Sequence, residues 1–408
     1  MPYIVGLNSG SSFDGIDAVL CTIELGHDGH PQPPKYVAAL TIDWPEALRE
    51  QVVRAFDNKL SIFELTRLNY AAGAIYATAV QQLLAENGLS PADIDVVGYD
   101  GQTVYQEPLE KDKAAAFAQE TGDKSLVDLW TKGGYPCGLF IAESGVVAAL
   151  SNITTVTQFR PVDHALGGSG APLMQYLDFV LFRGRGDYTA TLNIGGIANL
   201  QLANPDRSRM MAFDTGPGNV MVDHTMRVRK GLEYDPNGET AAKGKVIQSL
   251  LDELMKRDFF ERHPPRSAWR LDFGSSYADD ILERYADAST EDLVATFTMF
   301  TAASVEKALT DFVLPRAPTL KELIASGGGT RNRTMIELLR SRLSKHGITL
   351  LISDSIGIPS AYKEAIKFAT LAFATKRGLA NNIPAASGAS SFAVLGKLTV
   401  APRLGQGV

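Results

Sequence analysis

The feature that most constrains the fold is a strand followed by a glycine-bearing turn, a pattern that occurs four times along the chain. The turns are SGSS at 9–12, NIGGIAN at 193–199, DTGPGN at 214–219 and SGGGTRN at 326–332, each after an apolar run typical of a buried strand. Glycine permits positive φ and brings backbone N–H groups close to phosphate oxygens. One such turn is typical of an ordinary hairpin, but four at strand ends predict a nucleotide triphosphate site.

The first part of the chain opens with strand-like segments. Residues 3–7, 16–25 and 37–44 predict a three-stranded meander, in which the first glycine turn closes the first hairpin. Near-helical spacing of apolar residues predicts a helix over 61–87, and 95–104 reads as a strand that ends in a polar loop.

The next stretch alternates helices and strands. Residues 138–150 predict a helix that leads to a strand at 154–160, and 170–182 predict a further helix with proline near its start. The polar segment 107–133 is interpreted as a surface insertion.

The strand, turn and strand pattern starts again after residue 185. Residues 189–203 repeat it, and 208–223 form a strand and a glycine turn that opens a helix. A mainly helical region to about 314 follows, and then come two strands, at 322–329 and 348–354, and a helix at 360–378. The pattern predicts an α/β protein with lobes 1–185 and 186–408, whose C-terminal end is free to return to the first lobe.

Composition narrows the function. A chain of 408 residues suits two large lobes, and its net charge of −7 without a basic block argues against a nucleic-acid partner. Cys21 and Cys137, the only cysteines, lack metal-site spacing, which disfavours a disulfide framework or zinc site and indicates a reducing compartment. No signal peptide and no apolar run of membrane-spanning length occur, so we expect a cytoplasmic protein without a membrane partner.

Two common phosphate-binding motifs are missing. The sequence contains no GxxxxGK[ST], and no GxGxxG follows the first strand, which disfavours a P-loop or dinucleotide fold. Two facing lobes that each donate a phosphate hairpin, with adenosine on a later glycine turn, are the arrangement of the actin, hexokinase and heat-shock superfamily.

The opening GLNSGSSFDGID at 6–17 resembles the GLxSGTSxDGID opening of the anhydro-N-acetylmuramic acid kinases and the related levoglucosan kinases. The resemblance continues, in order, through DGQTV at 100–104, FRPVDHALGGSGAPL at 159–173, LNIGGIANL at 192–200, FDTGPGN at 213–219, SGGGTRN at 326–332 and PSAYKEAIKFA at 359–369. It implies a two-lobed actin-like ATPase (ribonuclease H-like) sugar kinase fold with a central inter-lobe cleft. It also implies a first lobe with a phosphate hairpin and the catalytic aspartate, and a second lobe with another phosphate hairpin and the adenosine site.

The resemblance implies ATP and Mg²⁺ as cofactors, a small-molecule sugar as substrate and a homodimer. Family members phosphorylate a 1,6-anhydro-sugar while water opens the anhydro bridge, which requires one carboxylate as base. Asp163 matches the family's catalytic aspartate in the FRxxD segment. The alternative is that Asp163 caps the following helix.

The predicted nucleotide and phosphate contacts lie in the four glycine turns. They are Gly10, Ser11, Ser12, Asp14, Gly15, Gly195, Gly196, Asp214, Gly216, Gly218, Asn219, Gly327, Gly328, Gly329 and Asn332. Asp14, beside the first glycine turn, is a predicted metal ligand because Mg²⁺ prefers carboxylate oxygens, and the resemblance implies Glu364 as a second, since it matches a family acid near the sugar and metal. Turn bracing by Asp14 or Asp214, and an ordinary exposed helical role for Glu364, remain alternatives.

The predicted sugar contacts are Asp100, Thr103 and Glu364, of which Thr103 could also be an ordinary strand-end threonine. The family usually has histidine where this chain has Asp100, which changes the charge beside the expected sugar pocket. Asn8 and the segment 138–150 resemble the levoglucosan branch, whereas GGSGAPL and the SGA at 387–389 resemble the muropeptide-sugar branch. The sequence therefore leaves the choice of sugar open.

Two other functions remain open at this point. One is a kinase of an ordinary hexose or polyol, in which Asp163 deprotonates a hydroxyl and no ring opens. The other is a nucleotide-binding regulatory module of actin-like fold that has lost efficient chemistry.

Overall fold

The computed structural model describes residues 2–10, 15–107, 126–131, 137–268 and 270–402. The chain forms two compact units, one of Met1–Leu181 with Glu364–Val408 and the other of Phe182–Lys363. The second unit thus begins four residues before the boundary placed from the sequence, and residues from Glu364 onward belong to the first unit.

The first unit is built on a six-stranded sheet with the order β13-β7-β4-β1-β2-β3. Its strands are β1 (Tyr3–Ser9), β2 (Gly15–Thr22), β3 (Lys35–Asp43), β4 (Ile94–Gly98), β7 (Thr155–Thr157) and β13 (Lys397–Thr399). The first three strands pair antiparallel, which confirms the predicted meander. Strands β4 and β7 run parallel to β1, so these three strands end at the same edge of the sheet.

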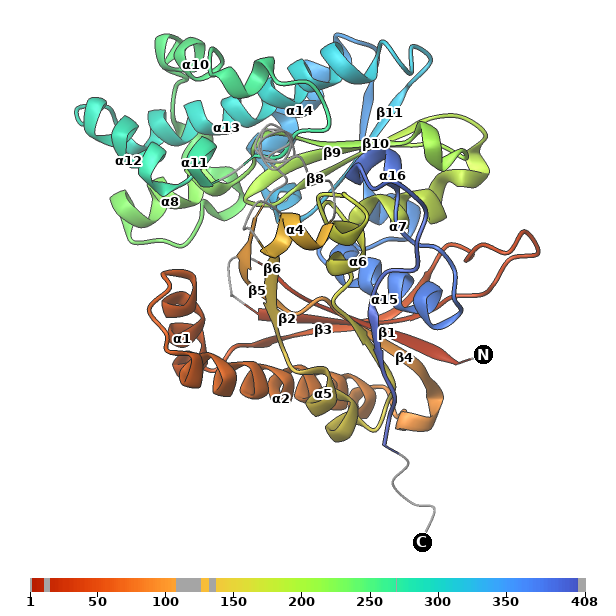
Figure 1. The fold of residues 1–408 in the computed structure, drawn as a ribbon. Helices are drawn as coiled ribbons and strands as arrows, with labels where there is room; N and C mark the ends of the chain where they lie inside the picture. The colour runs from red at the N-terminus through yellow and green to blue at the C-terminus, as the bar shows by residue number, and fades with distance from the viewer. Residues whose placement is uncertain (1, 11–14, 108–125, 132–136, 269, 403–408) are drawn as a thin grey trace, which may run out of the picture. The chain divides into compact units, whose positions relative to one another are not determined.

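The helices of this unit cover both faces of the sheet. They are α1 (Glu46–Phe56), α2 (Ile62–Glu86), α4 (Leu126–Thr131), α5 (Ser144–Ser151), α6 (Arg160–Ala165), α7 (Met174–Phe182), α15 (Lys363–Lys376) and α16 (Pro384–Ser387). Helix α2 runs along one face with α5 beside it (Figure 1). Its start is fixed locally, because Ser61 accepts from the Glu64 N–H and Glu64 accepts from the Ser61 N–H.

Helix α15 lies very close to the strands, and two glycines make this approach possible. A Cβ on Gly6 would lie 2.0 Å from the carbonyl oxygen of Ala365, and a Cβ on Gly98 would lie 2.2 Å from that of Phe368. Both partners belong to α15. Because a larger residue in either strand would push the helix away, these glycines set the spacing between the sheet and the helix.

The prediction of one helix over 138–150 is wrong. Gly138–Ile141 forms strand β6, which pairs antiparallel with β5 (Gln102–Gln106) in a separate two-stranded sheet. The helix α5 begins only at Ser144, where the Glu143 side chain accepts from the Gly145 N–H. The apolar run is compatible with a helix or with a strand. The first four residues form a strand because they pair with β5, which lies far away in the sequence. Most of the predicted insertion at 107–133 lies outside the described residues.

The second unit is built on a five-stranded sheet with the order β10-β9-β8-β11-β12. Its strands are β8 (Thr189–Ile194), β9 (Ile197–Ala203), β10 (Met211–Pro217), β11 (Glu322–Ser326) and β12 (Thr349–Ile352). Its helices are α8 (Val220–Lys230), α9 (Glu239–Lys243), α10 (Gln248–Leu254), α11 (Arg270–Phe273), α12 (Ser275–Arg284), α13 (Thr290–Ala308) and α14 (Arg333–Ser344). The predicted second strand, turn and strand repeat is confirmed by β8 and β9.

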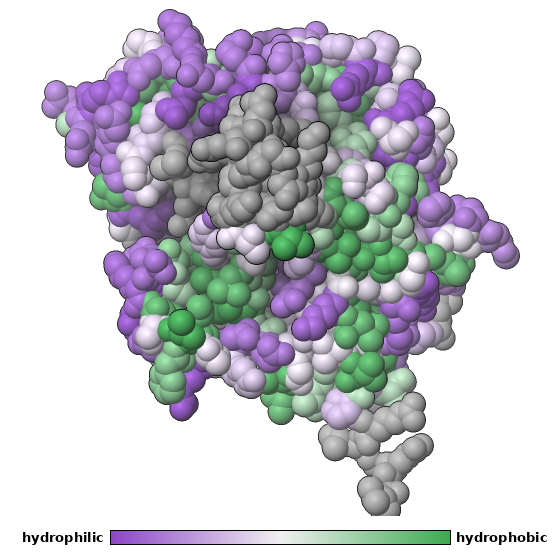
Figure 2. Space-filling model, viewed as in Figure 1, coloured by the Kyte–Doolittle hydropathy of each residue, from purple (hydrophilic) through white to green (hydrophobic). Residues whose placement is uncertain are grey.

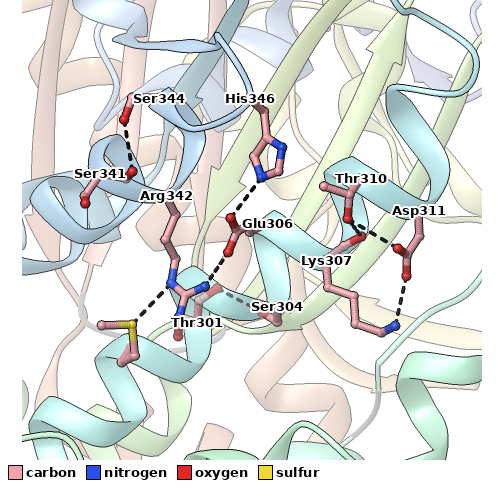
Figure 3. A network of polar contacts seen from close by, with 11 residues as sticks. Thr301, Ser304, Glu306, Lys307, Thr310, Asp311, Ser341, Arg342, Ser344 and His346 are labelled. Carbon is pink, nitrogen blue, oxygen red and sulfur yellow. Dashed lines mark hydrogen bonds and ion pairs between the residues drawn. The ribbon is translucent and has the colours of Figure 1, made fainter.

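Helix α13 is the hub of this unit. One side packs on the sheet with α14, and the other packs in a cluster with α8, α10 and α12. A polar network joins α13 to the end of α14, where Glu306 accepts from Arg342 and bonds His346 at 2.9 Å (Figure 3). Burial tends to raise the pKa of Glu306, but His346 and Arg342 outweigh it and lower that pKa. The outer surface over α10 and α12 is mainly hydrophilic (Figure 2).

Among the described residues, no helix has the length and apolar character needed to cross a membrane.

Candidate active site

The first unit gathers the predicted catalytic segments at one edge of its sheet. Strands β1, β4 and β7 end there, and each is followed by one of the motifs, which carry Gly10, Asp100 and Asp163 respectively. The carboxyl ends of parallel strands are where α/β proteins place their sites. Ser11, Ser12 and Asp14 lie outside the described residues, and Gly15 begins β2.

The end of β1 is tied to the segment after β4 by buried hydrogen bonds. The Ser9 hydroxyl donates to Gln102 Oε1 at 2.6 Å, and Trp44 Nε1 donates to the Ser9 oxygen at 2.9 Å. Ser9 and Gln102 were not chosen from the sequence, although both lie inside the quoted motifs. Their bond ties the end of β1 to the DGQTV segment.

Asp163 lies inside α6 and is almost completely buried, with an exposed fraction of 1%. Its Oδ2 accepts from the Gly170 N–H at 2.9 Å, and its Oδ1 accepts from the Ser387 hydroxyl at 2.8 Å. The donors come from the loop after α6 and from α16, and neither is an N–H of the following helix, α7. The helix-cap alternative for Asp163 is therefore not supported.

The loop after α6 wraps closely around this carboxylate. A Cβ on Gly168 would lie 2.2 Å from Asp163 Oδ2, so only glycine fits there. The Gly168 N–H donates to the Asp163 carbonyl at 2.8 Å, and the Ser169 N–H donates to the Ser387 carbonyl at 2.9 Å. The GGSG loop therefore holds the Asp163 carboxylate in one position by close packing and hydrogen bonds.

Asp100 is buried and its two oxygens accept from protein donors. The Phe159 N–H donates to Oδ1 at 3.0 Å, and Arg160 Nε donates to Oδ2 at 2.6 Å. Arg160 also donates from Nη1 to the Gly170 carbonyl at 2.8 Å. Sequence reasoning missed Arg160, although it belongs to the FRPVD motif. The residue predicted to contact sugar is therefore linked, through Arg160, to the loop that holds Asp163.

Thr103 and Glu364 are placed on two further elements of this unit. Thr103 lies on β5 opposite Phe140 and is partly exposed. Glu364 is in the first turn of α15, and its carboxylate lies 3.7 Å from Lys367 Nζ. Lys367 is buried above the Phe368 ring, and this burial lowers the pKa of its ammonium group. Lys367 was not identified from the sequence.

The three glycine turns of the second unit converge at one edge of its sheet. Strands β8, β10 and β11 all end at this edge. The Gly218 N–H donates to the Gly196 carbonyl at 2.8 Å, and the Asn219 N–H donates to the Gly195 carbonyl at 2.8 Å. The tertiary structure therefore joins NIGGIAN and DTGPGN into one double loop at the start of α8.

The glycines of these turns fall into two classes. A Cβ on Gly218 would lie 2.2 Å from the Gly195 carbonyl oxygen, and Gly216 and Gly327 have φ of 151° and 88°, so the fold itself requires these glycines. Gly329 is also packed, against Ile194. In contrast, a Cβ on Gly328 would meet no atom within 4 Å. Protein packing does not explain glycine at 328, which leaves room for a ligand against the backbone.

Asp214 is held at this edge by the segment that precedes α11. Its Oδ2 accepts from the Ala268 N–H at 2.7 Å, and its backbone exchanges hydrogen bonds with Arg266. Desolvation raises the pKa of Asp214 to about 7, against the lowering effects of the Ala268 N–H and Arg266. This carboxyl group therefore changes charge near neutral pH. The positive charge on Arg266 is also desolvated, which lowers its pKa to about 10.

A family model described as anhydro-N-acetylmuramic acid kinase matches residues 2–133 and 125–401 of the chain. The chain belongs to the anhydro-N-acetylmuramic acid kinase family. It is 34% identical to anhydro-N-acetylmuramic acid kinases of Bacillus cereus and of Bacillus anthracis, each over 403 residues that cover 98% of this chain and all of the relative. The prediction of an ATP-dependent sugar kinase is confirmed at this level.

Similarity to solved structures is weaker. The activator of the 2-hydroxyisocaproyl-CoA dehydratase from Clostridium difficile with bound ADPNP is 13% identical at a TM-score of 0.42, with 92% of this chain and 96% of that chain covered.

Asn332, a predicted nucleotide contact in this kinase-family chain, has a clear part in the fold. Its side chain accepts from the Met335 N–H at 2.9 Å and caps α14. The SGGGTRN turn therefore leads directly into the N-terminus of α14.

Magnesium was predicted for this family member. No group of three or more histidine, cysteine, aspartate or glutamate side chains suited to a metal occurs in the described part of the chain. Mg²⁺ usually takes only one or two protein carboxylates together with substrate phosphates and water. The partly exposed Glu364 carboxylate fits that need, and Asp14 lies outside the described residues.

A hollow of about 340 Å³ in the second unit is lined by residues of α10, α13 and α14, including Glu306, Lys307 and Arg342. None of the predicted site residues of this kinase-family chain lines it. Of its charged residues, Glu306 pairs with Arg342 and His346, and Lys307 pairs with the neighbouring Asp311 (Figure 3), so we do not assign it to the candidate site.

Proposed function

We propose that this family member is an ATP-dependent kinase of a 1,6-anhydro-sugar, either anhydro-N-acetylmuramic acid or levoglucosan, and that Asp163 is the catalytic base. The observation that carries the proposal is the buried Asp163 carboxylate, seated by the Gly170 N–H and the Ser387 hydroxyl at the edge where β1, β4 and β7 end. A fixed carboxylate with remaining lone pairs suits removal of a proton from a bound water.

In this reaction Asp163 takes a proton from water while the water oxygen bonds to the anomeric carbon. The bond between that carbon and the bridging O6 breaks, and O6 bonds to the γ-phosphorus of ATP as ADP leaves. Only one proton is removed from the water in each turnover, so a single carboxylate is sufficient as the base.

The glycine turns are proposed to hold the nucleotide. Gly10 and Gly15, and the second unit's double loop of Gly195, Gly196, Gly216, Gly218 and Asn219, are assigned to the phosphates. The N–H groups of Gly195, Gly218 and Asn219 already donate to carbonyls, so we assign these three residues the part of shaping the loop. Gly327, Gly328 and Gly329 are assigned to the adenosine end, where the free space beside Gly328 supports the proposal. Asp214, Ser11 and Ser12 complete the phosphate contacts.

Asp14 and Glu364 would hold Mg²⁺, which neutralises charge on the transferring phosphoryl group when bound. Thr103, Asp100 and Glu364 are assigned to the sugar. Asp100 accepts from Phe159 and forms an ion pair with Arg160, which sets the charge beside the sugar, so we assign Asp100 chiefly an electrostatic part.

The decisive test is a sugar panel with ATP and Mg²⁺ in ¹⁸O-labelled water. ADP release with anhydro-N-acetylmuramic acid or levoglucosan, and a 6-phosphosugar that carries label at the anomeric position, is the expected outcome. Phosphorylation of a hexose or polyol with no label would favour simple transfer. Tight ATP binding without sugar-dependent ADP release would favour a regulatory module.

A homodimer and a cytoplasmic location are also part of the proposal. Light scattering on the purified protein tests the first, and cell fractionation tests the second.

A further inference from the structure

A small, partly open cavity within the first unit is lined by Asp163. Its volume is about 10 Å³, and it is bounded by Asp163, by residues of the loop before α7 and of α7 itself, and by the segment from 381 to 395. Such a volume accommodates about one water-sized sphere.

The wall of this cavity contains a polar group that the described protein does not satisfy. Gln175 lines the cavity and is 3% exposed, and its Oε1 has no hydrogen-bond partner among the described residues. An unsatisfied buried acceptor costs about 1–3 kcal/mol, so native proteins normally supply it with a donor, commonly an ordered water. Asp163 and Ser387 line the same cavity.

The Asp163 carboxylate has capacity for a further donor. A carboxylate offers about four lone-pair positions. Gly170 and Ser387 supply one donor each. Two positions therefore remain, and Asp163 itself lines the cavity.

We propose that the cavity binds one internal water, which donates one hydrogen to Gln175 Oε1 and the other to Asp163, and that Ser387 and Gln175 are positioning residues for the base. We assign this water a holding role, separate from that of the water consumed in the reaction. With the Gly170 N–H and the Ser387 hydroxyl, it fixes the plane of the carboxylate. The kinetic part of the inference rests on the proposed function.

A crystal structure of the full chain at high resolution tests the water directly. One ordered water within hydrogen-bond distance of both Gln175 Oε1 and the Asp163 carboxylate is expected. An empty cavity, or a Gln175 Oε1 that accepts from a protein donor, would overturn the proposal. This readout does not depend on activity, so it stands even if the sugar panel gives no turnover.

Kinetics test the positioning role. Ser387→Ala should lower kcat about tenfold with little change in KM for ATP, since one hydrogen bond to a charged group is lost. It should also move the acidic limb of the kcat/KM profile to higher pH, because the lost donor favoured the ionised base. Ser391→Ala, a change at an exposed serine of the same segment, is the matched control and should leave both quantities unchanged.

Gln175→Leu removes the acceptor and closes the cavity with an apolar group. It should lower kcat several-fold while thermal stability is kept or raised, because a buried unsatisfied group is gone. If Ser387→Ala and Gln175→Leu both fold and show wild-type kcat and pH profile in an active enzyme, the positioning roles are wrong although the proposed function stands.

Discussion

Arg160 donates to the carboxylate of Asp100 at 2.6 Å, and the side chains of the two residues are 14% and 3% exposed. Through its second donor, Arg160 also holds the Gly170 carbonyl. Asp100, a predicted sugar contact, is thus the counter-ion of an arginine that supports the loop around Asp163, the proposed base. We therefore expect a change at position 100 to affect the proposed base as well as the proposed sugar contacts.

Replacing Asp100 with histidine should destabilise the protein. Arg160 would keep its buried charge without a carboxylate partner, and breaking a buried pair in this way costs about 3 kcal/mol. Thermal or urea unfolding measures the change. Asp100→Asn is the milder comparison, because an amide oxygen still accepts from the Phe159 N–H. A histidine variant as stable as wild type would show that the pair contributes little.

Asp163→Asn should reduce kcat by at least about 100-fold, since general base catalysis contributes on the order of 10² to 10⁴. ATP affinity should change little, and circular dichroism should show a folded protein. Asp287→Asn, at an exposed position, is the matched control. Full turnover by the Asp163 variant would remove Asp163 from the role of base.

Asp214 should make stability depend on pH. The pKa of its carboxyl group is about 7 in the folded protein and near the ordinary value of 3.8 when unfolded. Between these values the folded state binds the extra proton, so its contribution to stability is complete below the lower value and is lost as pH rises through the upper one. As pH rises from about 4 to about 7, wild type should therefore lose stability relative to Asp214→Asn. Above about pH 7 the difference in the free energy of unfolding between the two proteins should stay constant. Urea unfolding of both proteins across this range is the measurement, and a constant difference would contradict the raised pKa.

Two glycines of the second unit should separate folding from binding. Gly218→Ala places a methyl group against the Gly195 carbonyl and should cost on the order of 2 kcal/mol of stability. Gly328→Ala meets no protein atom and should fold normally but bind ATP more weakly. Thermal unfolding and calorimetric ATP titration of both variants give the answer. Unchanged ATP affinity in Gly328→Ala would place the nucleotide elsewhere.

Local sequence signals predicted much of the fold correctly. The meander of β1, β2 and β3 follows from apolar runs broken by turns, and α2 follows from the helical spacing of its apolar residues. The error at 138–150 arose because a contact that is distant in the sequence decides the structure there. Strand β6 exists because β5 pairs with it, and no residue inside the segment signals that partner.

The sequence motifs predicted the main residues of the candidate site but not the residues that hold them in place. Asp163 was recognised through the FRxxD segment, whereas Ser387, its hydroxyl donor, lies 224 residues further along the chain. Gln175 reads as an ordinary residue of an apolar helix. Arg160 lies inside the quoted FRPVD motif but was not chosen as a site residue. Its pairing with Asp100 depends on how the segments after β4 and β7 meet.

By itself, the sequence determined the family, the enzyme class, the glycine turns and the identity of the candidate base, because these are properties of short contiguous motifs. Tertiary structure alone decided which of those motifs meet. Parallel strands β1, β4 and β7 end at one edge, and Asp163 receives one donor from its own loop, Gly170, and one from a distant segment, Ser387, in a place lined by a small cavity. Hydrogen bonds between such distant segments carry no local signal, since each partner would be equally acceptable in many other surroundings.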